Sequence, residues 1–378
     1  MLPKRLRENL FERASVKTMR YVTAVPVRSA IGLVRRTYEM ITEDFFVNGS
    51  LSSHSRVPEL FAGSWLGGRE IVLVSDHVDR TTKEAMGATL SYVNDCPYCA
   101  DMLVSLVHGS GNHKAASQIL KESEEDVSDP KLRTRLLWAR QIASNASDEV
   151  GTTPFTAEEL PEAIGTLFVL NYVNRVSHVL MDGSPVGDAL KNASLRLFGY
   201  ELRETTERPI QPGRGLDLLP KAPIPEDMDW ARPNSRIADA LARWSAAVDR
   251  EAASAISPNV RQLVLDRLEV WNGERMLLSR NWVEQEVEGL TGEDYHIARL
   301  ILVVCKASYQ FDDSLVQALM GEKLDEERLI RILAFAAMSA ARRLAVLVSR
   351  RLHIMENGEV EMPETQTPVR TKHEMTNS

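Results

Sequence analysis

The sequence predicts an all-α protein made of two tandem helical units joined by a proline-rich linker. Apolar residues recur at helical spacing along most of the 378 residues. A single short stretch is a good candidate for a β-strand, and prolines interrupt the helical pattern near the middle of the chain. The length also suits about two domains, each large enough to bury a core.

The composition is that of a globular protein and excludes several classes of function. Hydrophobic residues make up 44% of the chain, and the net charge of -8 disfavours a nucleic-acid partner. No apolar run approaches the roughly 18 residues that a membrane span needs, so no membrane partner is expected. Glu8 and Glu12 argue against a transit peptide in the arginine-rich N-terminus. Three cysteines make no disulfide framework, so we expect a cytoplasmic protein.

The first unit is predicted over residues 1–202 and begins with a helical extension. Thr156 is followed three residues later by Glu159, which is a capping signal in front of a long apolar run. REIVLVSDHV, residues 69–78, is the strand candidate. We interpret it as the start of a buried helix, because no nearby segment would pair with it. Amphipathic helices of this unit are predicted at residues 28–46, 130–144 and 155–181.

The second unit is predicted to be a degenerate copy of the first, reached through the linker. The linker, residues 203–235, carries six prolines, and each proline inside a helix removes a donor and clashes with the preceding turn. The helical unit follows at residues 236–355. The polar residues 356–378 are expected to be a disordered tail.

An internal repeat supports the tandem arrangement. A glutamate and a cysteine are separated by eleven residues in both halves, and residues 174–180 resemble residues 342–348. The copies match Glu84, Cys96 and Cys99 with Glu293, Cys305 and Ser308, and Asp312 follows in the second copy. The second copy has no second thiol and cannot form an internal disulfide, so its motif residues are interpreted as structural.

The stretch NDCPYC, residues 94–99, has the strongest chemical pattern in the chain. Asn94 and Asp95 favour a helix start, and Pro97 suits the first turn. Cys96 and Cys99 then lie about one turn apart, where free N–H groups and the helix dipole stabilise a thiolate. A sulfenic acid on one cysteine can be resolved by the other. The pattern therefore favours redox or nucleophilic chemistry.

Other interpretations of these residues stay open. A zinc site would need two more ligands, and the chain has no second C-x-x-C, so no metal is expected. The cysteines could instead be an inert buried pair. The chain also lacks a glycine-rich phosphate loop, and no cofactor is expected.

Two further groups of polar residues are weaker candidates. Ser75, Asp76 and His77 are interpreted as a turn, since adjacency in the sequence does not make a triad. The other group consists of polar residues within an apolar helix. These residues could form hydrogen bonds with buried backbone groups, make a subunit contact or line a pocket. They are Asn171, Asn174, Arg175 and His178.

HSRVPELFAGSW, then Glu84, eleven residues and NDCPYCADM resemble the carboxymuconolactone decarboxylase family, in its alkylhydroperoxidase D-like branch. The resemblance covers about residues 54–182 and is faint in the second half. It implies an all-helical, oligomeric fold in which Cys99 is the peroxidatic thiol and Cys96 the resolving thiol. Glu84 would belong to a proton relay that deprotonates the pair.

The chain departs from the family pattern at Leu103, where the resemblance implies a histidine. His108 cannot replace it simply, because it lies nine residues after Cys99 and would point about 180° away on a regular helix. Glu84 or a water molecule would then have to act directly as the base.

The expected function is thiol-dependent reduction of a hydroperoxide. The partners would be a small hydroperoxide and an external dithiol reductant, and the resemblance implies a homo-oligomer. One alternative is a non-redox decarboxylase or lyase acting on a small carboxylic acid or lactone. The other alternative is a catalytically degenerate helical scaffold.

Overall fold

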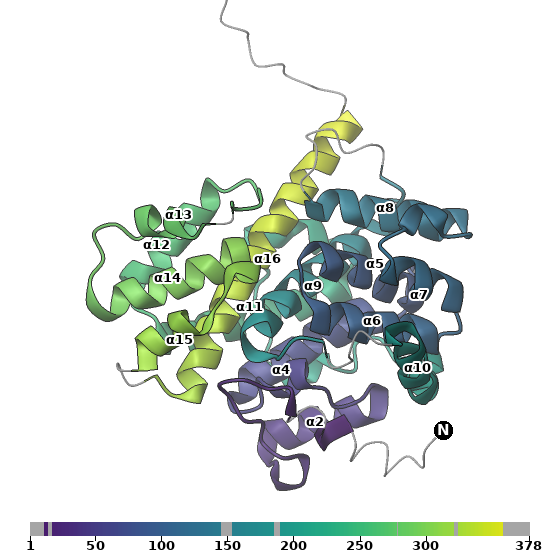
Figure 1. Ribbon diagram of the computed structural model, residues 1–378, viewed down its shortest axis with the longest axis horizontal. Coiled ribbons are helices and arrows are strands. Elements are labelled where there is room, and N and C mark those ends of the chain that lie inside the picture. The colour runs from purple at the N-terminus through teal and green to yellow at the C-terminus, as the bar shows by residue number, and fades with distance from the viewer. Residues whose placement is uncertain are drawn as a thin grey trace, which may run out of the picture.

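The computed structural model is all-α, which confirms the predicted fold class (Figure 1). The structure describes residues 11–13, 17–144, 153–184, 190–277, 279–320 and 324–357. Within these ranges there is no β-sheet, and the single isolated bridge joins Met19 to Met181. The predicted tail, residues 356–378, lies outside the described residues except for the end of the last helix.

Long helices alternate with short helical turns along the chain. The α-helices of the first half are α2 (Gly32–Asp44), α3 (Gly49–Ser52), α4 (Pro58–Gly67), α5 (Arg80–Val93), α6 (Pro97–Gly109), α7 (His113–Leu120), α8 (Pro130–Ser144), α9 (Leu160–Leu180) and α10 (Lys191–Glu207). Those of the second half are α11 (Ser235–Ala255), α12 (Pro258–Glu269), α13 (Asn281–Glu286), α14 (Gly292–Ala307), α15 (Asp313–Met320) and α16 (Glu326–Asn357). The short turns are η1 (Val27–Ser29), η2 (Gly68–Leu73), η3 (Glu124–Asp126), η4 (Leu216–Leu218), η5 (Glu226–Ala231) and η6 (Ser308–Gln310).

The local sequence signals explain where several elements begin. The strand candidate at residues 69–78 is helical at its start, because η2 is a π-helical continuation of α4 and the chain becomes extended only at Val74. In front of α9, the Thr156 N–H donates to Glu159 Oε2 over 3.1 Å, which is one half of the predicted capping box.

The two halves contact each other through long helices, and each half contributes helices to this contact (Figure 1). α16 lies along α9, and α11 lies along α4. Within each half a further helix covers this contact: α5 packs on α9, and α14 packs on α16. Buried residues of both halves belong to one continuous hydrophobic cluster, so the halves share a core.

Glycines on α4 permit the close approach of α11. The Trp244 ring is fully buried against Gly63 and Gly67, which lie one turn apart on α4. A Cβ atom at either glycine would collide with the indole ring. These two glycines therefore provide a flat surface for the largest buried side chain of the second half.

The predicted linker, residues 203–235, follows a fixed path over the first half. Its first residues belong to α10, which continues through Glu207 before the prolines begin. The buried carboxylate of Glu70 then accepts hydrogen bonds from the backbone N–H groups of Gly213 (2.8 Å) and Gly215 (3.0 Å). A buried acid on η2 thus anchors the segment, since its two oxygens need partners.

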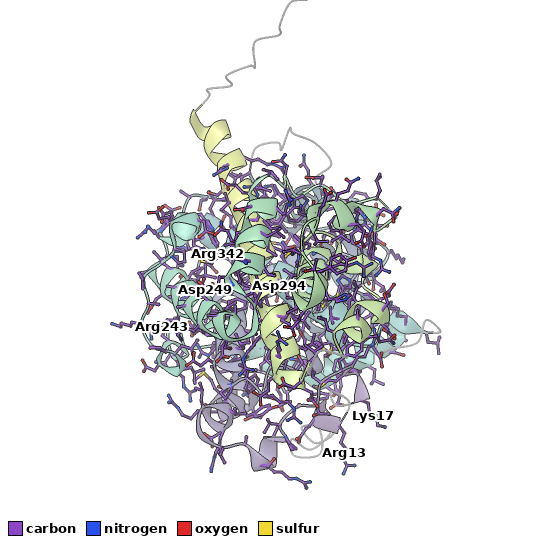
Figure 2. The ribbon with its side chains drawn as sticks, turned by 90° about the vertical axis from the view of Figure 1, so that its left-hand side faces the viewer. Arg13, Lys17, Arg243, Asp249, Asp294 and Arg342 are labelled. Carbon is purple, nitrogen blue, oxygen red and sulfur yellow. The ribbon has the colours of Figure 1, made fainter. Side chains whose placement is uncertain are left out.

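α16 is long and apolar enough to cross a membrane by length and composition alone, although the sequence indicated no such run. In the fold, 67% of its most apolar window is buried inside the protein. The side chain of Arg342 on this helix pairs with Asp227 at 2.7 Å and lies 3.9 Å from Asp249 (Figure 2). α16 therefore behaves as a core helix with one charged edge.

Candidate thiol site

Cys96 and Cys99 lie at a helix start, where the sequence placed them. Asp95 has a positive φ of 55°, which lets the chain turn sharply after α5. Cys96 directly precedes α6, and its N–H donates to the Ser91 carbonyl over 2.8 Å. Pro97 occupies the first helical position, and Cys99 lies in the first turn. Both thiols are free, and their residues are only 2% and 3% exposed.

The two thiols have opposite electrostatic environments. Burial raises the pKa of Cys99, but hydrogen bonds from Cys96, Ser177 and Asn174 outweigh it and bring that pKa below its ordinary value. Burial and the hydrogen bond to Cys99 hold the pKa of Cys96 well above its ordinary value. Cys99 is therefore the thiol of the pair that loses its proton more readily.

Polar residues of α9 position these hydrogen-bond donors. Asn174 donates to Ser91 Oγ over 3.0 Å, and its oxygen accepts from Asn94 Nδ2 over 2.9 Å. Ser177 Oγ lies 3.1 Å from Ser50 Oγ. The sequence singled out Asn174 but missed Ser177. Their spacing of three residues, which places both on one helix face, was the available signal.

Cys99 lines a cavity of about 110 Å³ between α4, α5, α6 and α9. Its polar lining is confined to Cys99, Glu84, Tyr98, Asn48 and Ser50. The rest of the wall is apolar, with Phe45, Leu51, Trp65, Val72, Leu73, Met102, Leu103, Leu106, Val169, Leu170 and Val173. A cavity of this kind suits a small organic molecule better than a highly solvated one.

Glu84 reaches the same cavity from α5. Arg80 donates to its Oε1 over 2.7 Å, while the buried Oε2 has no hydrogen-bond partner among the described residues. Burial raises the pKa of Glu84 above its usual value, even though Arg80 acts in the opposite direction. The helical hairpin of α5 and α6 thus brings Glu84 and Cys99 to one cavity, although a continuous helix would hold them about 22 Å apart.

Leu103 occupies the wall of this cavity one turn after Cys99, where the family resemblance implies a histidine. It packs against Gly87, where an added Cβ would lie 3.3 Å from Leu103 Cδ1. An apolar side chain at this point cannot carry a proton between Glu84 and Cys99.

None of the nearby histidines takes this place. His108 Nε2 lies 3.1 Å from Asn192 Oδ1, and its Nδ1 lies 3.2 Å from His113, away from the cavity. His54 is buried beside Tyr172, with Nε2 3.0 Å from the phenol oxygen. Burial lowers the pKa of both His54 and His108 to about 4, so both rings are neutral at pH 7.

Other sequence candidates do not form a site. Ser75 Oγ accepts a 3.0 Å hydrogen bond from the Arg80 N–H at the start of α5. His77 Nε2 lies 3.9 Å from Asp76 and is half exposed, so the three residues make no triad. Within the described ranges, no group of three histidine, cysteine or acidic residues could hold a metal ion.

The motif positions of the second half have a different geometry. Glu84 and Cys96 are separated by a helix break, whereas Glu293 and Cys305 lie on the single helix α14. Cys305 Sγ donates to the Ala336 carbonyl over 3.2 Å, and burial raises its pKa to about 12. The remaining positions make structural contacts: Glu293 with Arg328, Ser308 with His178 and Asp312 with Arg280. Equal spacing therefore does not place the two pairs in equivalent positions.

Comparison with known proteins finds a distant similarity to a Mycobacterium tuberculosis protein named alkyl hydroperoxide reductase. The two are 27% identical over 336 residues, which cover 88% of this chain and 96% of that protein. No family model matches the chain. No solved structure matches it either. The similarity extends over both halves and agrees with a distant, alkylhydroperoxidase-like relationship.

Proposed function

We propose that the protein reduces an organic hydroperoxide, with Cys99 as the attacking thiol. The observation that carries the proposal is the position of Cys99 on an apolar cavity, with hydrogen bonds from Cys96, Ser177 and Asn174 that favour its thiolate. The named activity of the Mycobacterium tuberculosis relative, alkyl hydroperoxide reduction, supports the same class of reaction.

The proposed reaction consumes one hydroperoxide and one dithiol. The Cys99 thiolate attacks the terminal oxygen of ROOH, the O–O bond breaks, and RO⁻ leaves and takes up a proton to give ROH. The resulting Cys99 sulfenic acid is attacked by Cys96, which forms a disulfide and releases water. An external dithiol reduces this disulfide and is itself oxidised, as expected in a reducing cytoplasm.

Glu84 is the proposed proton donor for the alkoxide. Its raised pKa makes the protonated carboxyl group easier to form than in an exposed glutamate, and its Oε2, which has no hydrogen-bond partner among the described residues, lies in the wall of the same cavity. The carboxyl group would donate its proton without an intervening imidazole, because Leu103 occupies the position where a histidine would relay it. The apolar wall also favours alkyl hydroperoxides over hydrogen peroxide.

A thiol count tests the proposal. One equivalent of cumene hydroperoxide should remove two of the three free thiols per reduced chain, and mass spectrometry should locate a disulfide between Cys96 and Cys99. Cys305 is the internal control and should remain free, because it is buried with a pKa of about 12. Three intact thiols after exposure to peroxide would overturn the redox function.

A catalytically degenerate scaffold is the second candidate, and Leu103 is the observation that favours it. In that case, peroxide would oxidise the three thiols no faster than it oxidises the thiol of an unfolded cysteine peptide. The same thiol count therefore separates the two candidates.

A further inference from the structure

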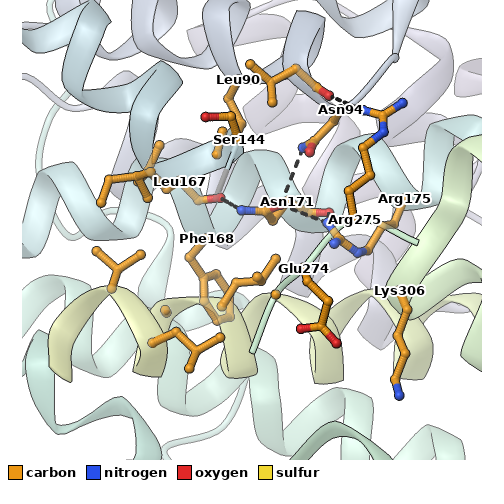
Figure 3. Close-up of a pocket in the computed structure, with 18 of the residues that line it drawn as sticks. Leu90, Asn94, Ser144, Leu167, Phe168, Asn171, Arg175, Glu274, Arg275 and Lys306 are labelled. Atoms are coloured by element: carbon orange, nitrogen blue, oxygen red, sulfur yellow. Dashed lines mark hydrogen bonds between the residues drawn. The ribbon is translucent and has the colours of Figure 1, made fainter. Parts of the chain in front are cut away.

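A second cavity lies between the two halves and shares no lining residue with the thiol cavity (Figure 3). Its volume is about 160 Å³. Helices α5, α8 and α9 of the first half and α14 and α16 of the second contribute to its wall, together with the segment that follows α12. Neither the thiol chemistry nor the packing of the halves uses this space.

Arg175 lies in the wall of this interhalf cavity and is only 7% exposed. Its Nε donates to the Cys305 carbonyl over 3.0 Å, and its Nη1 donates to the Asn171 carbonyl (3.0 Å) and side-chain oxygen (2.8 Å). Its Nη2 donates to no acceptor in the part of the chain that the structure describes. Within the same residues no carboxylate pairs with Arg175, and burial lowers its pKa to about 10.

An unpaired buried cation is unfavourable, because a charge inside a protein needs a partner to replace its lost hydration. Three further cations, Lys306, Arg275 and Arg351, line the wall, and Arg351 has interaction partners of its own. Lys306 pairs with Glu286 at 2.7 Å, and Arg275 pairs with Asp95. The acid in the wall, Glu274, is exposed and accepts from the Asn272 N–H instead (2.9 Å). Arg175 thus leaves one positive charge facing the cavity.

Much of the remaining wall is apolar, and Asn94, Ser144, Ser308 and Tyr309 add polar groups to it. Leu90, Ile164, Leu167 and Phe168 form one side, and Trp271 and Val348 close it from the second half. A ligand that fills this space would combine a single negative charge with a hydrocarbon body. A phosphate dianion would bring more charge than one guanidinium neutralises, so a carboxylate fits the site better.

We infer that the interhalf cavity binds a small monocarboxylic acid, with its carboxylate on Arg175 and its hydrocarbon chain against the leucine, isoleucine and phenylalanine side chains. The inference does not depend on the proposed peroxidase function, because the two cavities have separate walls. In this inference the neighbouring Asn171 holds the guanidinium in place beside the cavity.

Isothermal titration of the full chain with sodium hexanoate tests the inference. One saturable site per chain is expected. The uncharged analogue 1-hexanol, inorganic phosphate and hexyl phosphate should each bind at least about tenfold more weakly. Equal binding of 1-hexanol would overturn the role of the charge, and tighter binding of hexyl phosphate would overturn the choice of a carboxylate. A flat titration with hexanoate would overturn the whole site.

Arg175→Met should weaken hexanoate binding at least about tenfold, because it removes the charge and keeps the length of the side chain. Arg133→Met is the matched control, since Arg133 also donates to a backbone carbonyl, that of Val127, and neither residue lines the cavity. Ala143→Phe keeps Arg175 and fills the apolar end, and it should also abolish binding. If Arg175→Met fails to fold, unchanged binding to Ala143→Phe would overturn the inference by itself.

Discussion

Cys99 and Cys305 are both buried cysteines on helices, yet the surroundings of their sulfur atoms differ. Cys99 lies in the first turn of α6 and lines a cavity, and its pKa is lowered. Cys305 lies near the end of α14, inside the shared core, and its pKa is raised to about 12. Burial acts in the same direction on both thiols. The difference therefore comes from the donors around the sulfur.

The donors differ because of where each helix begins. At Cys99 the chain breaks after Asn94, so the sulfur faces α9, where Ser177 and Asn174 supply protons for hydrogen bonds. At Cys305 the helix is continuous, and the S–H itself donates to the Ala336 carbonyl. A carbonyl oxygen accepts the thiol proton and disfavours its loss. In this fold the lowered thiol pKa thus occurs at a helix start with donors on the facing helix, whereas burial without such donors raises the thiol pKa.

The largest expected effect is on turnover. Cys99→Ser should reduce the consumption of cumene hydroperoxide with dithiothreitol to background, a loss of more than about a thousandfold, because the attacking atom is removed. Cys305→Ser should stay within about twofold of the unmodified protein. A coupled assay of dithiol oxidation measures both variants. Equal activity of the two variants would show that Cys99 and Cys305 do not differ in their contribution to turnover.

Much of the fold could be predicted from helical periodicity. The helix predicted at residues 130–144 is α8 with the same bounds, because Pro130 fixes its first turn and the apolar face continues to its end. The path of the linker could not be predicted, because it depends on the buried carboxylate of Glu70, which is far from the linker in sequence. Tertiary hydrogen bonds of this kind have no local pattern.

The candidate site was predictable only in part. The helix-starting signals at Asn94 and Pro97 placed both thiols. Counting eleven residues back to a glutamate also selected Glu293, but no helix break separates this residue from Cys305. Spacing along the chain does not record where a helix stops. Arg175 was singled out, yet its lack of a carboxylate partner could be seen only in three dimensions.

The next effect is on thiol reactivity. Alkylation of Cys99 by iodoacetamide should rise with pH and level off below 9.0, the ordinary pKa of a thiol, because its folded-state pKa is lowered. At pH 8 it should react about a thousandfold faster than Cys305, whose thiolate is scarce below about 12. Mass spectrometry of the two peptides at timed intervals measures both rates. A plateau above 9.0 for Cys99 would contradict the role of the α9 donors.

A smaller effect is expected from restoring a proton carrier. Leu103→His should increase peroxide turnover about tenfold, a modest share of what general acid–base catalysis supplies, because an imidazole would lie between Glu84 and Cys99 on the cavity wall. Leu103→Gln is the control, since it adds polarity without a titrating group. A well-folded Leu103→His protein that gains no more than Leu103→Gln would show that proton transfer does not limit the rate.

The smallest effect tests one donor of the thiolate. Ser177→Ala should raise the pKa of Cys99 by about one unit, since a hydrogen bond to a charged group contributes about 1.5 kcal/mol and one pKa unit corresponds to 1.36 kcal/mol. Turnover at pH 7 should fall a few-fold and recover at higher pH, where the thiolate forms again.

Ser308→Ala is the matched control for this donor, because the Ser308 hydroxyl bonds to His178 and to neither thiol of the pair. A pH profile of alkylation that shifts for Ser177→Ala but not for Ser308→Ala would assign the lowered pKa to α9. If neither profile moves, Cys96 and Asn174 alone account for the lowered pKa of Cys99, and the contrast with Cys305 then rests on the helix break that brings Cys96 beside it.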